Sequence, residues 1–217
     1  MNVSTKVQHI WWATARCGSR AVSEILKHYD FFNYKVSPIF TPESDIRNVS
    51  HTHDYGVPKE YSDYKIIIQT RNPYSREVSN WHLACFKETK NELIITKGFE
   101  EWVYANQKAV VEQELRTYKP DYYIRYEHLQ EDILNLPFVD INNPNVLRDY
   151  HSNILANQYK YEGVDDPRGD IRRDNKDGRY ADWKSYYIYN PRIAGIVHEK
   201  YKEQFKLFNY EKDSWKQ

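Results

Sequence analysis

The chain has 217 residues, enough for one well-buried core, so we expect a single domain over residues 1–217. Its 31 basic and 31 acidic side chains cancel, so no overall field favours nucleic acid or a membrane surface as a partner. The two cysteines, Cys17 and Cys85, give neither a disulfide framework nor a metal-binding spacing, which is typical of a reducing compartment. Met1 to Val7 lacks a signal-peptide core, and no apolar run approaches the roughly 20 residues that span a bilayer. We therefore expect a cytoplasmic protein.

The spacing of apolar residues predicts strands alternating with helices along the chain. This alternation indicates an α/β fold, with a central, mainly parallel sheet covered by helices on both faces in three layers (α/β/α). In such folds ligands bind beyond the carboxyl ends of the strands. The predicted strands are Val7–Ala13, Phe31–Val36, Asn48–His53, Tyr64–Thr70 and Tyr122–Tyr126. The predicted helices are Arg20–Tyr29, Asn72 to about Phe86, Phe99–Tyr118, Leu129–Leu136, Asn145–Gln158 and one that starts at Asn190-Pro191.

The turn between the first predicted strand and the first helix has the composition of an oxyanion site. Gly18 permits a tight turn, and the helix start presents free N–H groups and the positive end of the helix dipole. Arg16, Arg20 and the Ser19 hydroxyl add charge and donors for a phosphate-like group. Cys17 is interpreted as a small filler, because no base is evident beside it. The common nucleotide loop G-x-x-x-x-G-K-[ST] is absent.

A second strand-tip site follows the apolar run Ile66-Ile67-Ile68. Arg71 stands at the end of this strand, and Ser79 lies about two turns into the next helix, so both could hold one phosphate. A single strand-tip arginine more often caps a carboxylate. Two such sites in one domain predict a ligand with two separated anionic groups.

The two motifs resemble the cofactor-binding motifs of the sulfotransferase superfamily, which uses 3′-phosphoadenosine 5′-phosphosulfate (PAPS). Arg16-Cys17-Gly18-Ser19 is similar to the segment that holds the 5′-phosphosulfate, and the following Val22-Ser23-Glu24-Ile25 is similar to the cytosolic branch. Arg71 and Ser79, with the Arg-Asn-Pro opening, match the pair that holds the 3′-phosphate. The resemblance implies the P-loop NTPase-like sulfotransferase fold, PAPS as cofactor and adenosine 3′,5′-bisphosphate (PAP) as product.

Further segments follow in the order of that family, up to Tyr210. Tyr126-Glu127-His128-Leu129 resembles the segment whose tyrosine lies near the adenine, and Gly178–Lys184 resembles the loop that closes over the 3′-phosphate. In that loop the resemblance assigns Lys176, Gly178 and Arg179 to the cofactor. Phe205–Tyr210 resembles the family's closing segment. The family's usual aromatic after the first motif is replaced by Ala21, which leaves Trp81 and Tyr126 as candidates to hold adenine.

The resemblance also implies a mechanism without a metal. Sulfuryl transfer is an in-line displacement that depends on positioning, on electrostatic stabilisation and on a base that takes the acceptor's proton. Arg16 would stabilise the bridging and leaving oxygens. His53 is the predicted base, because Thr52-His53 is similar to the Thr-His of cytosolic sulfotransferases and an imidazole suits proton abstraction near neutral pH. His51 and Glu43 remain the alternatives.

Two other functions are kept as alternatives: a nucleotide or small-molecule kinase with a degenerate phosphate loop, and a non-catalytic nucleotide-binding relative. A kinase would need a Gly-Lys pair and a following Mg²⁺-binding hydroxyl, which the loop lacks. The acceptor is expected to be a small molecule or sugar with a hydroxyl or amine, and the protein a monomer or homodimer without a nucleic-acid or membrane partner. The segments expected to wall the acceptor pocket are Tyr29–Val49, Phe86–Lys97 and Tyr159–Asp174.

Overall fold

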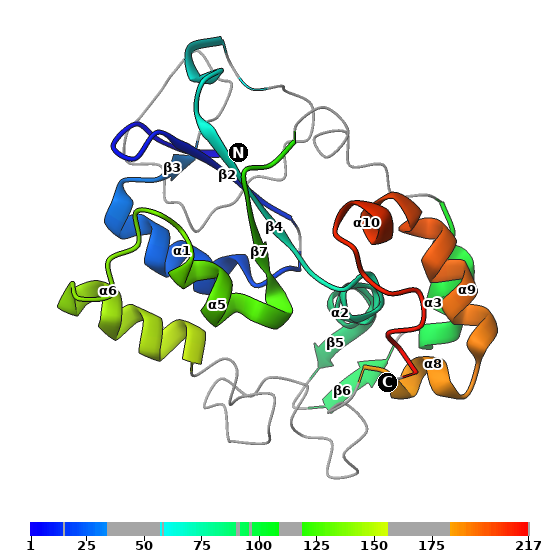
Figure 1. Cartoon of the computed structure of the whole chain (residues 1–217). Coiled ribbons are helices and arrows are strands. Elements are labelled where there is room, and N and C mark those ends of the chain that lie inside the picture. Colours follow the sequence, from blue (N-terminus) through cyan, green and yellow to red (C-terminus); the bar gives the residue numbers. More distant parts are fainter. Residues whose placement is uncertain are drawn as a thin grey trace. The chain divides into compact units, whose positions relative to one another are not determined.

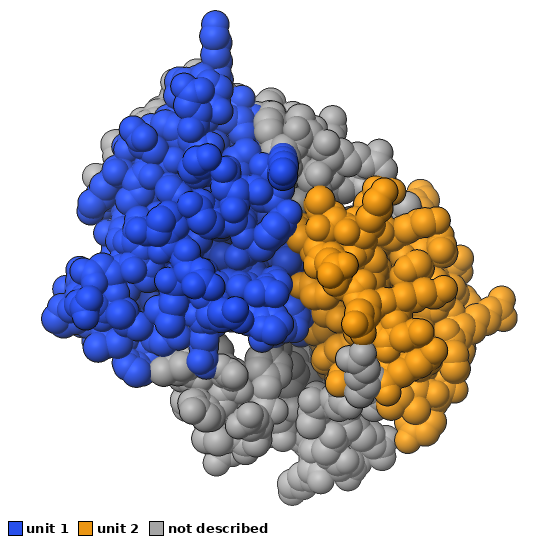
Figure 2. Space-filling model, viewed as in Figure 1, with its two compact units in different colours: residues 1–71, 112–158 blue, residues 72–111, 159–217 orange. Residues whose placement is uncertain are grey.

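The computed structural model describes residues 1–14, 16–33, 57, 59–89, 92–95, 97–108, 119–155 and 183–216. Contacts within the chain divide it into two compact units, shown in Figure 2. Unit 1 comprises residues 1–71 and 112–158, and unit 2 comprises residues 72–111 and 159–217. The single domain over residues 1–217 stays a prediction. Within the described ranges, no helix is long and apolar enough to cross a membrane.

Unit 1 contains a five-stranded mixed sheet with helices packed around it, which makes the protein an α/β protein. The strand order is β3-β1-β2-β4-β7. The pairs β2–β4 and β4–β7 are parallel, whereas β1 runs antiparallel to both β2 and β3. The strands are β1 (Asn2–Ser4), β2 (His9–Ala13), β3 (Phe32–Asn33), β4 (Lys65–Thr70) and β7 (Tyr122–Arg125). The predictions of β2, β4 and β7 are confirmed to within two residues, and β1 is a strand that the sequence pattern did not predict.

The helices α1, α5 and α6 lie on one side of this sheet, as Figure 1 shows. Trp11, Ile67 and Ile124 from three neighbouring strands are fully buried, and they form one hydrophobic core with helix residues such as Ile25 and Ile133. This contiguous apolar burial is the main force that joins helix to sheet. The helical elements of unit 1 are α1 (Ser19–Leu26), η1 (Lys27–Tyr29), η2 (Lys59–Tyr61), η3 (Tyr126–His128), α5 (Leu129–Leu134), α6 (Pro144–Asp149) and the π-helical η4 (Tyr150–Leu155).

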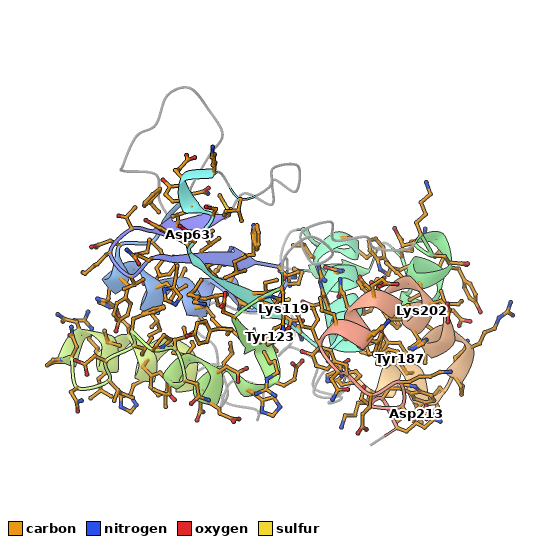
Figure 3. The ribbon with its side chains drawn as sticks, turned by 45° about the horizontal axis from the view of Figure 1, so that its top comes forward. Asp63, Lys119, Tyr123, Tyr187, Lys202 and Asp213 are labelled. Atoms are coloured by element: carbon orange, nitrogen blue, oxygen red, sulfur yellow. The ribbon has the colours of Figure 1, made fainter. Side chains whose placement is uncertain are left out.

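Unit 2 is built around α2 (Pro73–Cys85), which begins as the sequence predicts. The Asn72 side chain accepts a hydrogen bond from the Tyr74 N–H at 3.0 Å, and Pro73 occupies the first helical position. Tyr187, labelled in Figure 3, is fully buried, and its hydroxyl donates to the Tyr74 carbonyl at 2.9 Å. The other elements are the β5–β6 hairpin (Phe86–Thr89 and Glu92–Ile95), α3 (Phe99–Ala105), α8 (Ser185–Ile188), α9 (Pro191–Lys200) and α10 (Lys202–Leu207).

A buried carboxylate joins three elements of unit 2. Glu77 of α2 is fully buried, and its Oε1 accepts from Lys200 Nζ at 2.8 Å and from Trp102 Nε1 at 2.9 Å. Its Oε2 accepts from the Tyr201 hydroxyl at 2.6 Å. A buried carboxylate is tolerated only when it is paired in this way, so the network fixes α2 against α3 and α9.

His9 is a buried histidine at the start of β2. Its Nδ1 donates to the Val7 carbonyl at 2.5 Å, and its ring packs against Phe138 at 4.7 Å and Tyr122 at 5.7 Å between centroids. Nε2 is buried without a partner in the described structure. Burial therefore lowers the pKa of His9 below its usual 6.5, because desolvation disfavours the charged imidazole.

The lowered pKa predicts a loss of stability in mild acid. Below pH 6.5 the unfolded chain protonates His9 more readily than the folded protein does. The contribution of His9 to the free energy of unfolding is therefore complete above pH 6.5 and falls as the pH drops through the lowered pKa. The free energy of unfolding should fall in this window by at most about 1.4 kcal/mol per pH unit. Urea unfolding between pH 7.5 and 5 should show a shallower fall in His9→Gln. The exposed His128 supplies the control, and a His128→Gln variant that flattened the profile equally would contradict the assignment.

Candidate oxyanion site at the carboxyl ends of the parallel strands

The register of the parallel strands brings three predicted site segments to one edge of the sheet. Ala13 of β2 pairs with Gln69 of β4, and Thr70 of β4 pairs with Arg125 of β7. Because parallel strands end at a common edge, the loop after β2, Arg71 after β4 and Tyr126 after β7 all leave the sheet there. Such an edge is where ligands bind in α/β folds.

Arg71 contacts both of the other segments. Its guanidinium Nη1 donates to the Arg16 carbonyl at 3.1 Å, and its Cζ lies 4.2 Å from the centroid of the Tyr126 ring. A guanidinium over an aromatic face is attracted by the ring's negative π cloud, so the stack fixes the plane of the arginine. Arg71 is 7% exposed, so it is held in place by the protein and does not extend into water.

Gln69, the second-last residue of β4, contacts the same loop. Its side chain is fully buried, and its Nε2 donates to the Cys17 carbonyl at 2.5 Å. The loop is tied to β4 a second time by Thr14, whose hydroxyl donates to the Gln69 carbonyl. The sequence motifs do not include Gln69; the one signal for it is a polar residue at the end of a continuous apolar strand.

Three consecutive loop carbonyls are turned toward the protein. Arg71 holds that of Arg16, Gln69 holds that of Cys17, and the Gly18 carbonyl accepts from the α1 N–H groups of residues 21 and 22 at 3.0 and 3.4 Å. In a planar trans peptide the N–H points opposite to the C=O of the preceding residue, and the described chain contains no cis peptide. The N–H groups of residues 17, 18 and 19 therefore point away from these donors.

The outward N–H groups stand at the start of α1. The helix has no side-chain N-cap, and within the described residues the N–H groups of Gly18 and Ser19 have no acceptor. The helix dipole adds a partial positive charge at this end. Successive outward N–H groups at a helix start form a concavity that suits an oxyanion.

Gly18 is required here for two reasons. The first is its φ of +81°, a left-handed conformation that residues with a side chain disfavour. Arg16, two residues earlier, is also left-handed, with a φ of +65°. A Cβ on Gly18 would lie 2.8 and 2.9 Å from the Cδ2 and Cε2 of Tyr126. The sequence indicated a tight turn with close backbone approach; in the structure the group that approaches the backbone is the Tyr126 ring.

The remaining predicted residues fall into three groups: those in unit 1, those in unit 2 and those outside the described residues. Ser19 and Arg20 are the first two residues of α1, and Arg20 is exposed. Cys17 is buried. Ser79 is buried in α2 of unit 2, so its pairing with Arg71 stays a prediction. Trp81 is also buried in unit 2, with its Nε1 donating to the Lys97 carbonyl at 2.6 Å. The predicted base His53, its alternatives His51 and Glu43, and the loop residues Lys176, Gly178 and Arg179 lie outside the described residues.

In the described part of the chain, no group of three or more His, Cys, Asp or Glu residues is arranged to hold a metal ion. Comparison of the chain with protein-family models, with curated proteins and with solved structures found no match. Function must therefore be inferred from the residues at the carboxyl edge of the sheet and from their geometry.

The geometry at Gly18 predicts that Gly18→Ala is destabilising. A side chain at φ +81° is strained and would also displace the Tyr126 ring, so the free energy of unfolding should fall by about 1–3 kcal/mol. Chemical denaturation measures this directly. Gly195→Ala in α9 is the matched control: a Cβ there meets open space, so that variant should be neutral or slightly more stable. Equal stability of both variants would mean that Tyr126 does not pack on Gly18.

Proposed function

We propose that the protein is a PAPS-dependent sulfotransferase, which moves a sulfuryl group to a hydroxyl or amine of a small-molecule or sugar acceptor. The observation that carries the proposal is the convergence at one sheet edge of the outward N–H groups of the loop, Arg71 and Tyr126. These are the segments whose sequence resembles the phosphosulfate, 3′-phosphate and adenine motifs of that family. The proposal includes the family's three-layer fold, a cytoplasmic location and a monomer or homodimer.

In this proposal the loop supplies positioning and charge. The N–H groups of residues 17–19 and the Ser19 hydroxyl would hold the phosphosulfate oxygens, with Arg20 assisting. Arg16 would stabilise the charge that builds on the bridging and leaving oxygens. Preorganised donors of this kind act without reorganising during the reaction, and the inward anchoring of the loop carbonyls supports such preorganisation.

The second anion and the base complete the scheme. Arg71 and Ser79 are assigned to the 3′-phosphate, with Lys176, Gly178 and Arg179 closing over it. Tyr126 is assigned to the adenine, with Trp81 as the alternative. His53 is assigned as the base that takes the acceptor's proton, with His51 and Glu43 as the alternatives. No metal is required, because the leaving phosphate is stabilised by arginine and backbone donors.

The proposal predicts tight binding of PAP that depends on its 3′-phosphate. Calorimetric titration of the protein with PAP, AMP and ATP should give much the highest affinity for PAP, with no effect of a chelator. A preference for ATP that requires Mg²⁺ would overturn the proposal in favour of a kinase. PAP binding without sulfate transfer to any acceptor in a broad screen would favour the non-catalytic relative.

The same titration tests the role of Arg71. Loss of a charge-assisted contact to the 3′-phosphate should weaken PAP binding by about 10- to 100-fold in Arg71→Ala. Arg148→Ala in α6, where the side chain is 68% exposed, should bind PAP like the wild type. AMP lacks the 3′-phosphate, so its affinity should change far less in Arg71→Ala. Equal weakening of PAP and AMP would instead assign Arg71 to the anchoring of the loop.

For His53→Ala we expect turnover to fall by about 10²- to 10⁴-fold while PAP affinity is retained, because a general base acts on the acceptor's proton and not on the nucleotide. Single-turnover transfer from PAPS, together with the PAP titration, separates the two effects. The corresponding variants of His51 and Glu43 are the comparison. If one of them shows this pattern and His53→Ala does not, the base is misassigned.

A further inference from the structure

Only one end of the Gln69 side-chain amide forms a hydrogen bond in the described structure. Its Nε2 donates to the Cys17 carbonyl, and this bond fixes which end of the amide faces the loop, because a carbonyl can only accept. Its Oε1 accepts no hydrogen bond in the described structure, and water cannot reach it because the residue is fully buried. A buried acceptor without a partner carries a desolvation cost, and a second state in which Oε1 accepts a hydrogen bond would recover that cost at the expense of the Nε2 bond to Cys17.

The nearest backbone donor in that second state is the Gly18 N–H. The amide lies directly against this part of the loop, since Nε2 is 3.7 Å from the position of a Cβ on Gly18. A half-turn of the peptide between Cys17 and Gly18 would exchange the directions of its C=O and its N–H. The Gly18 N–H would then point toward the Gln69 amide, and the amide would have to turn end for end as well, so that Oε1 in place of Nε2 faces the loop and accepts from this N–H. Glycine can leave φ +81° for negative φ without steric cost.

The two peptide orientations differ in what they offer an anion. In the observed state the Gly18 N–H points outward, with the N–H groups of its neighbours at the start of α1. In the turned state the Cys17 carbonyl would point outward, and its partial negative charge would repel an oxyanion at the same place. An oxyanion therefore binds the first state better and shifts the equilibrium toward it.

We propose that Gln69 is the positioning residue of this oxyanion site. Its Nε2 holds the Cys17–Gly18 peptide with the N–H outward. After the amide has turned, its Oε1 accepts from the Gly18 N–H of the turned peptide, the state that a bound anion disfavours. The inference rests on the oxyanion loop of the proposed function, but not on the identity of the nucleotide or the acceptor. It concerns phosphate- and sulfate-type groups in general.

Gln69→Met tests the inference, because methionine keeps the length of the side chain and removes both the donor and the acceptor. Sulfate and PAP affinities should each fall by about tenfold, the worth of one well-placed hydrogen bond to the loop. Gln8→Met is the matched control: Gln8 is exposed and precedes β2, at the opposite end of the strand from the loop. The free energy of unfolding of each variant is measured alongside, because a purely structural role would change stability and leave anion affinity intact.

A second measurement uses the wild-type protein and does not depend on the variant folding. The Gly18 amide signal in an ¹⁵N–¹H spectrum should shift strongly as sulfate is added, and its hydrogen exchange should slow. Wild-type affinity in Gln69→Met, or a Gly18 amide that does not respond to bound sulfate, would overturn the role of Gln69 while leaving the anion site standing. Failure of the wild-type protein to bind sulfate, phosphate or PAP would overturn the site and this inference together.

Discussion

The parallel pairing of β4 with both β2 and β7 is the constraint from which the site follows. It buries β4 between two neighbours, so that Gln69, Thr70 and Arg71 at its end are almost inaccessible to water. Buried amide and guanidinium groups need partners, and here they donate to carbonyls of the loop that leaves β2. Satisfying the end of β4 therefore turns the loop carbonyls inward, and peptide planarity turns the N–H groups outward.

In our proposal this arrangement makes a local positive site in a chain whose formal charges cancel. The contributors are the start of α1, the outward N–H groups and arginines 16, 20 and 71, all from unit 1. In unit 2 the buried charge is negative. It is the Glu77 carboxylate, which accepts hydrogen bonds from Lys200, Tyr201 and Trp102. In both units buried polar groups specify which elements lie together, while apolar burial supplies most of the stability.

The sequence predicts best where one local signal dominates. The apolar run of β4 and the Asn-Pro start of α2 place these elements within one residue of their observed bounds. Strand β1 could not be predicted in the same way, because its three residues include a single apolar one and its burial depends on pairing with β2 and β3. The hydrogen bond from Gln69 to the loop could likewise not be predicted, since it joins residues 52 positions apart.

Tyr126 shows how a residue assigned by motif takes on a further role in three dimensions. The edge of its ring fills the space above Gly18, and one face carries the Arg71 guanidinium. A purine that stacks on Tyr126 must use the opposite face or displace Arg71. Displacing Arg71 would release the Arg16 carbonyl and loosen the loop that holds the phosphosulfate in our proposal. Stacking on the opposite face keeps the loop and Arg71, the two elements that bind anions in our proposal, intact, so the stack with Arg71 restricts where a nucleotide base can lie.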